Sequence, residues 1–311
     1  MESYKNRLSV FLGLFVPTGL WLAVFFLVPL GLIWLYSFGE TVSLTEVETT
    51  WTFENYARIL EPEILTLFWR SLWLAGISTA ICLLVGYPTA LVIATASPSW
   101  KPWLLLAVIL PFWTNLLIRT YALLNILGAR GRVNELLEGL WSFGDGALAL
   151  IGLGSLNLLG ERFEPVSFLG TPLGVVIGLV YVHLPFAVLP IYASIERLDR
   201  SYLEASLDLG ASQLQTFFRV LVPLTMAGVI AAAIITFIPM LGSFLTPDLL
   251  GRGQVDMIAN VIERQFKAAN DWPFGSAISL VLLYVTFLIL ALQSIAAMRQ
   301  GGRGRGREGG S

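Results

Sequence analysis

Six long apolar stretches dominate this 311-residue chain and restrict the folds open to it. A helix needs about 20 apolar residues to cross the core of a lipid bilayer, and each stretch meets that need. The composition agrees, because 56% of the residues are apolar and 13% are charged, whereas soluble domains carry roughly 25% charged residues. We therefore predict an all-α membrane protein with six transmembrane helices. The predicted spans cover about residues 10–38, 67–96, 103–127, 173–194, 222–246 and 276–298.

The charged residues between the spans predict the orientation. With six spans, segments 1–9, 97–102, 195–221 and 299–311 share one side; they contain ten Lys and Arg residues against six acids. The opposite segments, 39–66, 128–172 and 247–275, contain seven Lys and Arg residues against fifteen acids. Because basic residues are retained on the cytoplasmic side, both termini and the segment 195–221 are predicted to be cytoplasmic. Residues 1–298 then form one six-span domain, and the basic, glycine-rich residues 299–311 form a flexible cytoplasmic tail.

The predicted outer loop 128–172 contains a further apolar run, Ala147–Leu159. This run is short for a span, and Gly152 and Gly154 weaken a helix there. A seventh span would also place segment 195–221 outside and invert the charge bias. We interpret 128–172 as an extracytoplasmic loop with a short helix near Val133–Trp141 and an interfacial segment.

The predicted spans contain few side chains that could catalyse a reaction. An intramembrane hydrolase or transferase needs a pair of catalytic groups at membrane depth. The predicted spans contain one histidine, His183, one cysteine, Cys82, and no Asp or Glu in their interiors. The chain also lacks the Gly-x-x-x-x-Gly-Lys-Ser/Thr loop that cradles nucleotide phosphates. We expect no catalytic residue, no metal site and no cofactor of its own.

The polar segment before the fifth span has the pattern helix, sharp turn, helix. Ser201 with Glu204, and Ser212 with Gln215, have the spacing of capping boxes at two helix starts. Gly210 lies between them, where a helix commonly ends with a left-handed residue. Apolar residues at helical spacing give each piece an apolar face, a pattern that favours docking of a soluble partner. These residues are Leu203, Leu207, Leu214, Phe217, Phe218 and Leu221.

The same segment resembles the EAA loop of the permeases of binding-protein-dependent ABC importers. The resemblance rests on Glu204-Ala205-Ser206, on Gly210 after three intervening residues, and on a final Val220-Leu221-Val222-Pro223. The family usually has Ala-Ala after the Glu and Ile-x-Leu-Pro at the end. The resemblance implies that 195–221 is a cytoplasmic coupling loop that fits a cleft in an ATPase subunit. Its residues Glu204, Ala205, Ser206, Gly210 and Pro223 would then transmit the effect of ATP binding.

The resemblance also implies an assembly and a location. The chain would be a multi-pass inner-membrane protein that forms half of a translocation pathway with a second permease subunit. Two ATPase subunits carrying ATP and Mg²⁺ would lie on the cytoplasmic side, and a solute-binding protein outside. No nucleic-acid partner is expected. The close family match favours a paralogue, rather than a second copy of this chain, as the other permease.

Further motifs resemble the spermidine/putrescine permeases of the B and H type, over nearly the whole chain. They are Pro111–Asn115 with Arg119 and Tyr121, Gly178–Tyr181 with Leu184–Phe186, Pro190–Asp199, Gly242–Gly251 and Asp271–Gly275. The resemblance implies a polyamine as the solute. It leaves the choice between spermidine and putrescine open, because the binding protein does most of the selecting. Iron, thiosulfate, an opine or an aminophosphonate remain alternatives.

Four residues of these motifs are candidates for the substrate pathway. A polyamine carries several ammonium groups, so its route should offer carboxylates and aromatic faces. Trp113 stands about ten residues into the third predicted span, which puts it near the midplane of a straight helix. Asp248 would place a carboxylate at the outer mouth. Asn115 and Tyr181 join the candidates through the resemblance alone.

Two ionisable residues inside the predicted spans need separate interpretation. Arg119 stands sixteen residues beyond Trp103, close enough to the outer boundary to snorkel. A cation would repel a polyamine, so we favour a structural role with an ion pair or hydrogen bonds to a neighbouring helix. His183 lies near the middle of the fourth predicted span, and we interpret it as a neutral, hydrogen-bonded residue.

Overall fold

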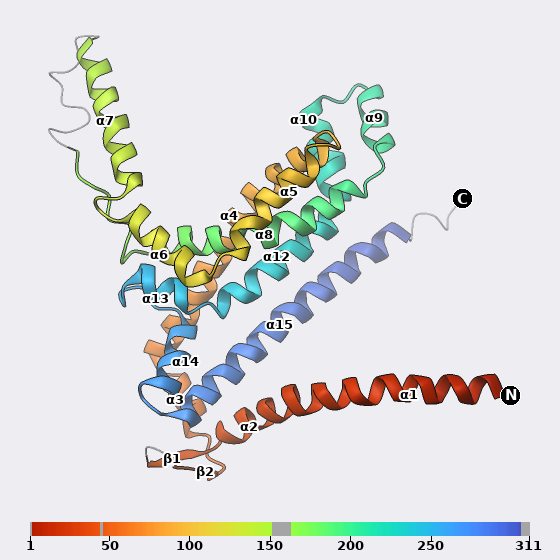
Figure 1. Ribbon diagram of the computed structural model, residues 1–311, viewed down its shortest axis with the longest axis vertical. Coiled ribbons are helices and arrows are strands. Elements are labelled where there is room, and N and C mark those ends of the chain that lie inside the picture. The colour runs from red at the N-terminus through yellow and green to blue at the C-terminus, as the bar shows by residue number, and fades with distance from the viewer. Residues whose placement is uncertain (1, 44–45, 151–162, 306–311) are drawn as a thin grey trace. The chain divides into compact units, whose positions relative to one another are not determined.

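The computed structural model describes residues 2–43, 46–150 and 163–305 of the chain. The chain divides into two compact units. Figure 1 labels their helices and strands. The first combines Met1–Leu65 with Val261–Ser311, and the second is Thr66–Asn260. Two helices, α4 (Pro62–Thr95) and α14 (Ile258–Lys267), each begin in one unit and end in the other.

The first unit contains the two terminal helical segments and a small hairpin. Helices α1 (Glu2–Leu22) and α2 (Val28–Tyr36) follow each other through a π-helical turn, η1 (Ala23–Leu27). The strands β1 (Glu40–Ser43) and β2 (Glu46–Glu48), then helix α3 (Glu54–Ile59), come next in the chain. Helix α15 (Trp272–Arg305) returns and contacts α2, α3 and β1.

A short two-stranded hairpin accompanies the helices, which form the rest of the regular structure in the described residues. β1 and β2 pair antiparallel, with Glu40 opposite Glu48 and Thr41 opposite Val47. β-branched residues suit a pleated ladder better than a helix, which explains why this polar stretch forms strands. The buried Asn55 side chain donates to the carbonyls of Ser37 at 3.1 Å and Gly39 at 2.9 Å and so fixes the start of the hairpin.

The second unit contains the remaining helices. In chain order after α4 they are α5 (Lys101–Ile109), the 3₁₀ turn η2 (Leu110–Trp113), α6 (Leu116–Leu127), α7 (Arg132–Leu150), α8 (Pro172–Glu196), α9 (Ser201–Asp208), α10 (Gln213–Thr216), the π-helical turn η4 (Phe217–Leu221), α11 (Val222–Leu224), α12 (Met226–Leu241) and α13 (Leu245–Gly251). One end of its core is built on α4, α8 and α12. The buried members of that cluster are Tyr87, Ala90, Ile93, Ala94, Val188, Ile191, Ile195, Leu221 and Ala232.

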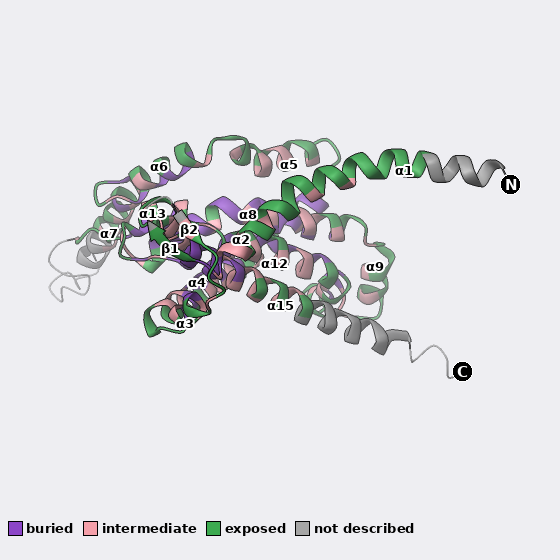
Figure 2. Ribbon diagram, turned by 90° about the horizontal axis from the view of Figure 1, so that it is seen from below, coloured by how far each residue is buried: buried purple, intermediate pink, exposed green. Residues whose placement is uncertain are grey.

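Buried residues concentrate on α8, whereas the helix α1 is exposed along its described side chains (Figure 2). In Val10–Tyr36, none of the most apolar 18-residue stretch is buried. In Pro172–Glu196, 61% of the corresponding stretch is buried. An apolar helix with this exposure needs lipid or another protein around it, because water would leave its whole surface unfavourably hydrated.

Four helices are long and apolar enough to cross a membrane alone: Val10–Tyr36, Pro62–Thr95, Pro172–Glu196 and Trp272–Ala291. The third and fifth predicted spans are bent instead. The angle is 95° between Lys101–Trp113 and Leu116–Gly144, and 65° between Gln213–Leu224 and Met226–Leu241. The part of the chain that the structure describes therefore has four spans, or up to six if each bent pair is one span.

Local chemistry explains each bend. Thr114 is extended, with ψ of 147°, and the Asn115 carboxamide oxygen accepts from the Leu117 amide at 2.8 Å, which starts a new helix. At the second bend, Thr225 leaves the helical region with φ of −98° and ψ of 6°. Residues 103–127 are therefore not one straight helix, and the depth of Trp113 that was derived from a straight helix stays a prediction.

Two other predictions need correction. Helix α7 runs from Arg132 to Leu150, longer than the short helix expected near Val133–Trp141. Most of the predicted interfacial segment, residues 151–159, lies outside the described residues. Residues 299–305, predicted to be a flexible tail, continue helix α15, and residues 306–311 lie outside the described residues.

Candidate functional site

Helix α9 ends in a Schellman motif built on Gly210. The Gly210 amide donates to the Leu207 carbonyl at 2.9 Å, and the Ala211 amide donates to the Ser206 carbonyl at 3.2 Å. Gly210 has φ of +85°, in the left-handed region that glycine enters without steric cost. The predicted sharp turn at Gly210 is confirmed.

Only one of the two predicted capping boxes forms. At α10 the Ser212 hydroxyl accepts from the Gln215 amide, and the Gln215 side chain accepts from the Ser212 amide. At α9 the box with Ser201 and Glu204 is absent, because Ser201 is already the first helical residue. The Asp199 carboxylate accepts from the Ser201 amide at 3.0 Å instead.

This hydrogen bond from the Ser201 backbone lowers the pKa of Asp199 below its usual value. A carboxylate with a lowered pKa stabilises the folded state above its unfolded pKa and loses that effect as pH falls through the folded pKa. The cap at the start of α9 is therefore intact at neutral pH.

Three side-chain contacts join α9 to α10 and link α4 to Phe217 and to Thr225. The Ser206 and Thr216 hydroxyls lie 3.0 Å apart and join α9 to α10. The Tyr87 hydroxyl of α4 lies 2.8 Å from the Thr225 hydroxyl, at the bend before α12. The Tyr87 ring packs edge-on against Phe217, with centroids 5.5 Å apart.

The coupling loop exposes several large apolar side chains among its polar ones. Leu209, Leu214 and Phe218 are exposed by 89%, 70% and 62%. Glu204, Ala205, Gly210 and Pro223 are exposed as well, whereas Ser206 is half-buried in its bond to Thr216. The predicted apolar faces are thus divided: Leu221 is buried in the core, and Leu207, Leu214 and Phe218 lie on the surface.

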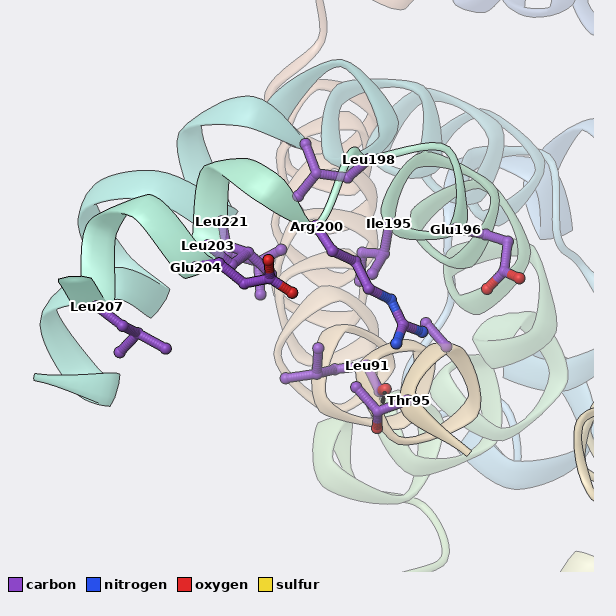
Figure 3. A pocket seen from close by; sticks show the side chains of 11 residues that line it. Leu91, Thr95, Ile195, Glu196, Leu198, Arg200, Leu203, Glu204, Leu207 and Leu221 are labelled. Carbon is purple, nitrogen blue, oxygen red and sulfur yellow. Dashed lines mark hydrogen bonds between the residues drawn. The ribbon is translucent and has the colours of Figure 1, made fainter. Parts of the chain in front are cut away.

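Behind α9 lies a pocket of about 370 Å³ between the ends of α4, α8 and η4 (Figure 3). Its walls are mostly aliphatic and include Leu91, Ile195, Leu203 and Leu221. Arg200 adds a positive charge to the lining, and Glu196 and Glu204 add two negative charges (Figure 3). No ion pair joins Arg200 to either carboxylate in the described part of the chain; Glu196 pairs with Lys101 at 2.6 Å.

The four predicted pathway residues lie on separate elements. Trp113 ends η2 and is 75% exposed, and Asn115 caps α6. Tyr181 on α8 is 40% exposed, and Asp248 is exposed in the first turn of α13. All four are accessible, but no hydrogen bond, ion pair or ring contact joins any two of them in the described residues.

Arg119 does not snorkel; its residue is only 7% exposed. Its Nε and Nη1 atoms have no hydrogen-bond partner in the described structure, so the expected ion pair or hydrogen bonds to a neighbouring helix are not found. The guanidinium instead lies 5.9 Å from the centroid of the Phe112 ring, which packs edge-on against Phe186 at 5.2 Å. Both aromatic residues stand in the motifs quoted above, but the sequence did not predict their contact, because the bend brings Phe112 to α8.

His183 is hydrogen-bonded, as interpreted. It is buried, and its Nδ1 atom lies 2.9 Å from the Leu179 carbonyl oxygen, one turn earlier in the same helix. The described residues contain no group of three or more His, Cys, Asp or Glu residues placed to hold a metal ion.

Residues 86–301 match the family described as binding-protein-dependent transport system inner membrane component. The chain belongs to this family. The match includes the coupling loop, the bend at Thr225 and the pathway candidates. The chain is accordingly a multi-pass inner-membrane permease, which confirms the predicted family and location.

Curated relatives match the permease over most of its length. It is 42% identical over 270 residues to the spermidine/putrescine transport system permease protein PotB of Escherichia coli, covering 87% of this chain and 91% of that protein. It is 40% identical to the protein of the same name from Haemophilus influenzae, covering 87% and 88%.

Solved structures support the fold. The permease superposes on a chain of a bacterial alginate ABC transporter, solved in complex with alginate pentasaccharide-bound periplasmic protein, with a TM-score of 0.73. The alignment covers 96% of this chain and 97% of the other at 16% sequence identity, so the likeness concerns the fold alone.

Proposed function

We propose that this chain is a permease subunit of an ATP-driven importer and forms half of the translocation pathway for a polyamine, spermidine or putrescine. The observation that carries the proposal is the 40–42% identity to spermidine/putrescine permeases over 87% of the chain. Family members that transport other small solutes keep the alternative open: iron, thiosulfate, an opine or an aminophosphonate.

The proposed topology has six spans, with each bent pair counted as one, and both termini in the cytoplasm. Ten Lys and Arg residues against six acids on one side, and seven against fifteen on the other, support this orientation. It places α9 and α10 on the cytoplasmic side and the β1–β2 hairpin outside. A bend within a span is tolerated where neighbouring helices or an aqueous cavity satisfy the freed backbone groups.

The coupling loop would dock on a dimer of ATPase subunits that bind ATP and Mg²⁺. Exposed Leu209, Leu214 and Phe218 supply an apolar contact surface, and Glu204 supplies a charge for an ATPase arginine or lysine. Closure of the ATPases would move α9 and α10 as a unit, because the Ser206–Thr216 bond joins them. The Tyr87–Thr225 contact would carry that motion into α4 and α12 and switch the pathway from inward-open to outward-open.

The pathway would run along Trp113, Asn115, Tyr181 and Asp248. Trp113 offers an exposed indole face on which an ammonium group gains roughly 0.5–2 kcal/mol. Asp248 offers an exposed carboxylate near the outer mouth. Asn115 acts through its cap on α6, which holds the bend that presents Trp113. A solute-binding protein would deliver the polyamine, and a paralogous permease would supply the other half of the pathway.

Uptake of radiolabelled spermidine tests the substrate. A bacterium lacking its own polyamine importers would express this permease with its ATPase, its partner permease and its binding protein. We expect ATP-dependent uptake that unlabelled putrescine reduces and that iron and thiosulfate do not. Glu204→Lys should abolish uptake by reversing the charge at the ATPase contact.

A different transported solute would contradict part of this proposal. Transport of iron or an anion with no spermidine uptake would overturn the polyamine assignment and the pathway roles of Trp113 and Asp248. The importer assignment would remain.

A further inference from the structure

The interior of the pocket behind α9 has no role in the coupling and pathway assignments. We propose that this pocket is a binding site for phosphatidylethanolamine. One acyl chain occupies the pocket, the phosphate lies on Arg200, and the ethanolamine ammonium lies on Glu204. The inference rests on the proposed orientation of the importer, which places the pocket at the cytoplasmic boundary of the membrane.

The pocket lies where two spans end. Thr95 is the last residue of α4 and Glu196 is the last residue of α8, and both line the pocket. In the described part of the chain, α4 and α8 are among the helices that are long and apolar enough to cross a membrane alone. In the proposed topology their ends lie in the layer that phospholipid headgroups occupy. A lipid therefore reaches the pocket directly from the bilayer.

The pocket combines buried apolar walls with exposed charged groups. Ala94, Ile195 and Leu221 are buried members of its lining. Arg200 and Glu204 are exposed members. A volume of about 370 Å³ with few polar groups is typical of small-molecule sites. Water is a poor occupant of the aliphatic part, because it needs several polar partners. A ligand with an apolar chain and a polar head matches this lining.

Two opposite charges on one turn of α9 stay separate at the pocket. The Glu204 amide donates to the Arg200 carbonyl at 3.1 Å, so the two residues are one turn apart and within reach of an ion pair. In the described residues their side chains nevertheless form none, and both line the pocket (Figure 3). The Lys101 Nζ atom lies 2.6 and 2.8 Å from the two carboxylate oxygens of Glu196, which neutralises that third charge.

These charges select the headgroup. A phosphate accepts hydrogen bonds from the planar fork of a guanidinium, and a primary ammonium donates up to about three hydrogen bonds to carboxylates. Phosphatidylethanolamine carries both groups. Phosphatidylglycerol has no cation for Glu204, and the quaternary ammonium of phosphatidylcholine has no N–H to donate. A carboxylate has about four lone-pair sites, so Glu204 accommodates the lipid ammonium together with the proposed cation of the ATPase.

Photo-crosslinking of the complete permease–ATPase complex in nanodiscs tests the site. The nanodiscs consist of phosphatidylcholine with a trace of phosphatidylethanolamine that carries a diazirine on one acyl chain. We expect labelled peptides from residues 91–95 and 195–207. Unlabelled phosphatidylethanolamine should compete at least about 10-fold better than unlabelled phosphatidylglycerol, as one additional charge-assisted hydrogen bond predicts.

Variants of the lining identify the groups that hold the lipid. Arg200→Gln should lower the labelling about 10-fold, because it removes the guanidinium and keeps an exposed polar side chain. Leu91→Trp should also lower it, because the larger side chain fills the pocket from α4. Arg197→Gln is the matched control, since Arg197 is exposed in the same segment but does not line this pocket, and it should change the labelling less than about twofold. Co-purification of the ATPase subunits with each variant shows that the complex is assembled.

Three outcomes would overturn the site: equal competition by phosphatidylethanolamine and phosphatidylglycerol, unchanged labelling of Arg200→Gln, or equal losses in Arg200→Gln and Arg197→Gln. The last would indicate a general attraction of lipid to basic residues. Displacement of the probe by free spermidine but not by unlabelled lipid would identify a site for a soluble amine and overturn the lipid equally. Failure of the proposed function is a separate outcome, because it appears as absent spermidine uptake by the wild-type importer, and the labelling needs no solute.

Discussion

Gly210 shows how one residue sets the geometry of the coupling loop. Its positive φ lets the chain reverse between α9 and α10, and a Cβ atom there would meet no other atom within 4 Å. Any substitution therefore acts through the backbone conformation and not through a clash. A left-handed alanine costs roughly 1–2 kcal/mol, and proline cannot adopt this conformation at all.

We predict that Gly210→Pro lowers solute uptake more than about 10-fold while basal ATPase activity persists. Proline removes the bond from the Gly210 amide to the Leu207 carbonyl and forces a negative φ, so α9 and α10 lose their relative placement. Uptake and ATP hydrolysis would be measured on the same reconstituted complex. Gly210→Asn is the matched control, because asparagine tolerates the left-handed region, and it should retain most uptake. Unchanged uptake in the proline variant would remove the coupling role from this turn.

We predict a graded effect at Trp113. Trp113→Ala should reduce spermidine uptake at low concentration by about 2- to 30-fold, the range that corresponds to one lost cation–π contact. Trp113→Phe keeps an aromatic face and should lose less. Initial uptake rates over a range of spermidine concentrations give the comparison; equal rates in all three proteins would take Trp113 off the pathway.

At the scale of elements, helices α8 and α12 can cross closely because residue 228 is a glycine, which has no side chain. A Cβ atom at Gly228 would collide with the Ser194 side chain and lie 2.9 Å from the Pro190 carbonyl oxygen. Small residues allow helix backbones to approach closely in membranes, where packing rather than the hydrophobic effect drives association. The α8–α12 contact is the frame on which the bend at Thr225 and the coupling loop are built.

We predict that Gly228→Ala destabilises the permease by about 1–3 kcal/mol, as overpacking of a tight contact does. The change would be seen as a lower apparent Tm and a lower yield of monodisperse complex in detergent. Ser194→Gly in the same chain should restore part of the loss, because it removes one of the two clashing groups. Gly76→Ala on α4 is the control, since no atom lies within 4 Å of its added Cβ. Equal effects of the two alanine substitutions would contradict the tight crossing.

At the scale of the whole molecule, the distribution of charges decides which surfaces meet which partners. In the proposed topology, the segments on the side with fewer acids include the coupling loop, and the segments on the opposite side include β1, β2 and α3. An inverted molecule would present the coupling loop to the outside, where no ATP is available.

We predict that a cysteine replacing Thr49 reacts with a membrane-impermeant maleimide in intact cells, whereas one replacing Ser97 reacts only after permeabilisation. Both positions are exposed, and the native Cys82 is fully buried, so it should give no background. Labelling would be read by mass shift on a gel. Reaction of Ser97→Cys in intact cells would invert the proposed topology.

The sequence alone determined the membrane class, the number of apolar segments and the position of the coupling turn. Each of these depends on local properties: the length of apolar runs, a helix-capping pattern and a glycine where φ is positive. The capping box expected at Ser201 does not form. The carboxylate of Asp199, two residues earlier, accepts a hydrogen bond from the Ser201 backbone amide instead. Hydropathy measures the length of an apolar segment and not the direction of its helix axis. It therefore did not indicate the bends in the third and fifth predicted spans.

Only the tertiary structure decided which residues meet. It joined Tyr87 to Thr225, 138 positions apart, and buried Arg119 beside Phe112 instead of at the membrane surface. It also put Glu40 opposite Glu48 and forced Trp51 into a left-handed conformation, neither of which leaves a local signal. Such contacts depend on packing between segments distant in the chain, and the free energy of that packing is not encoded in any short stretch of residues.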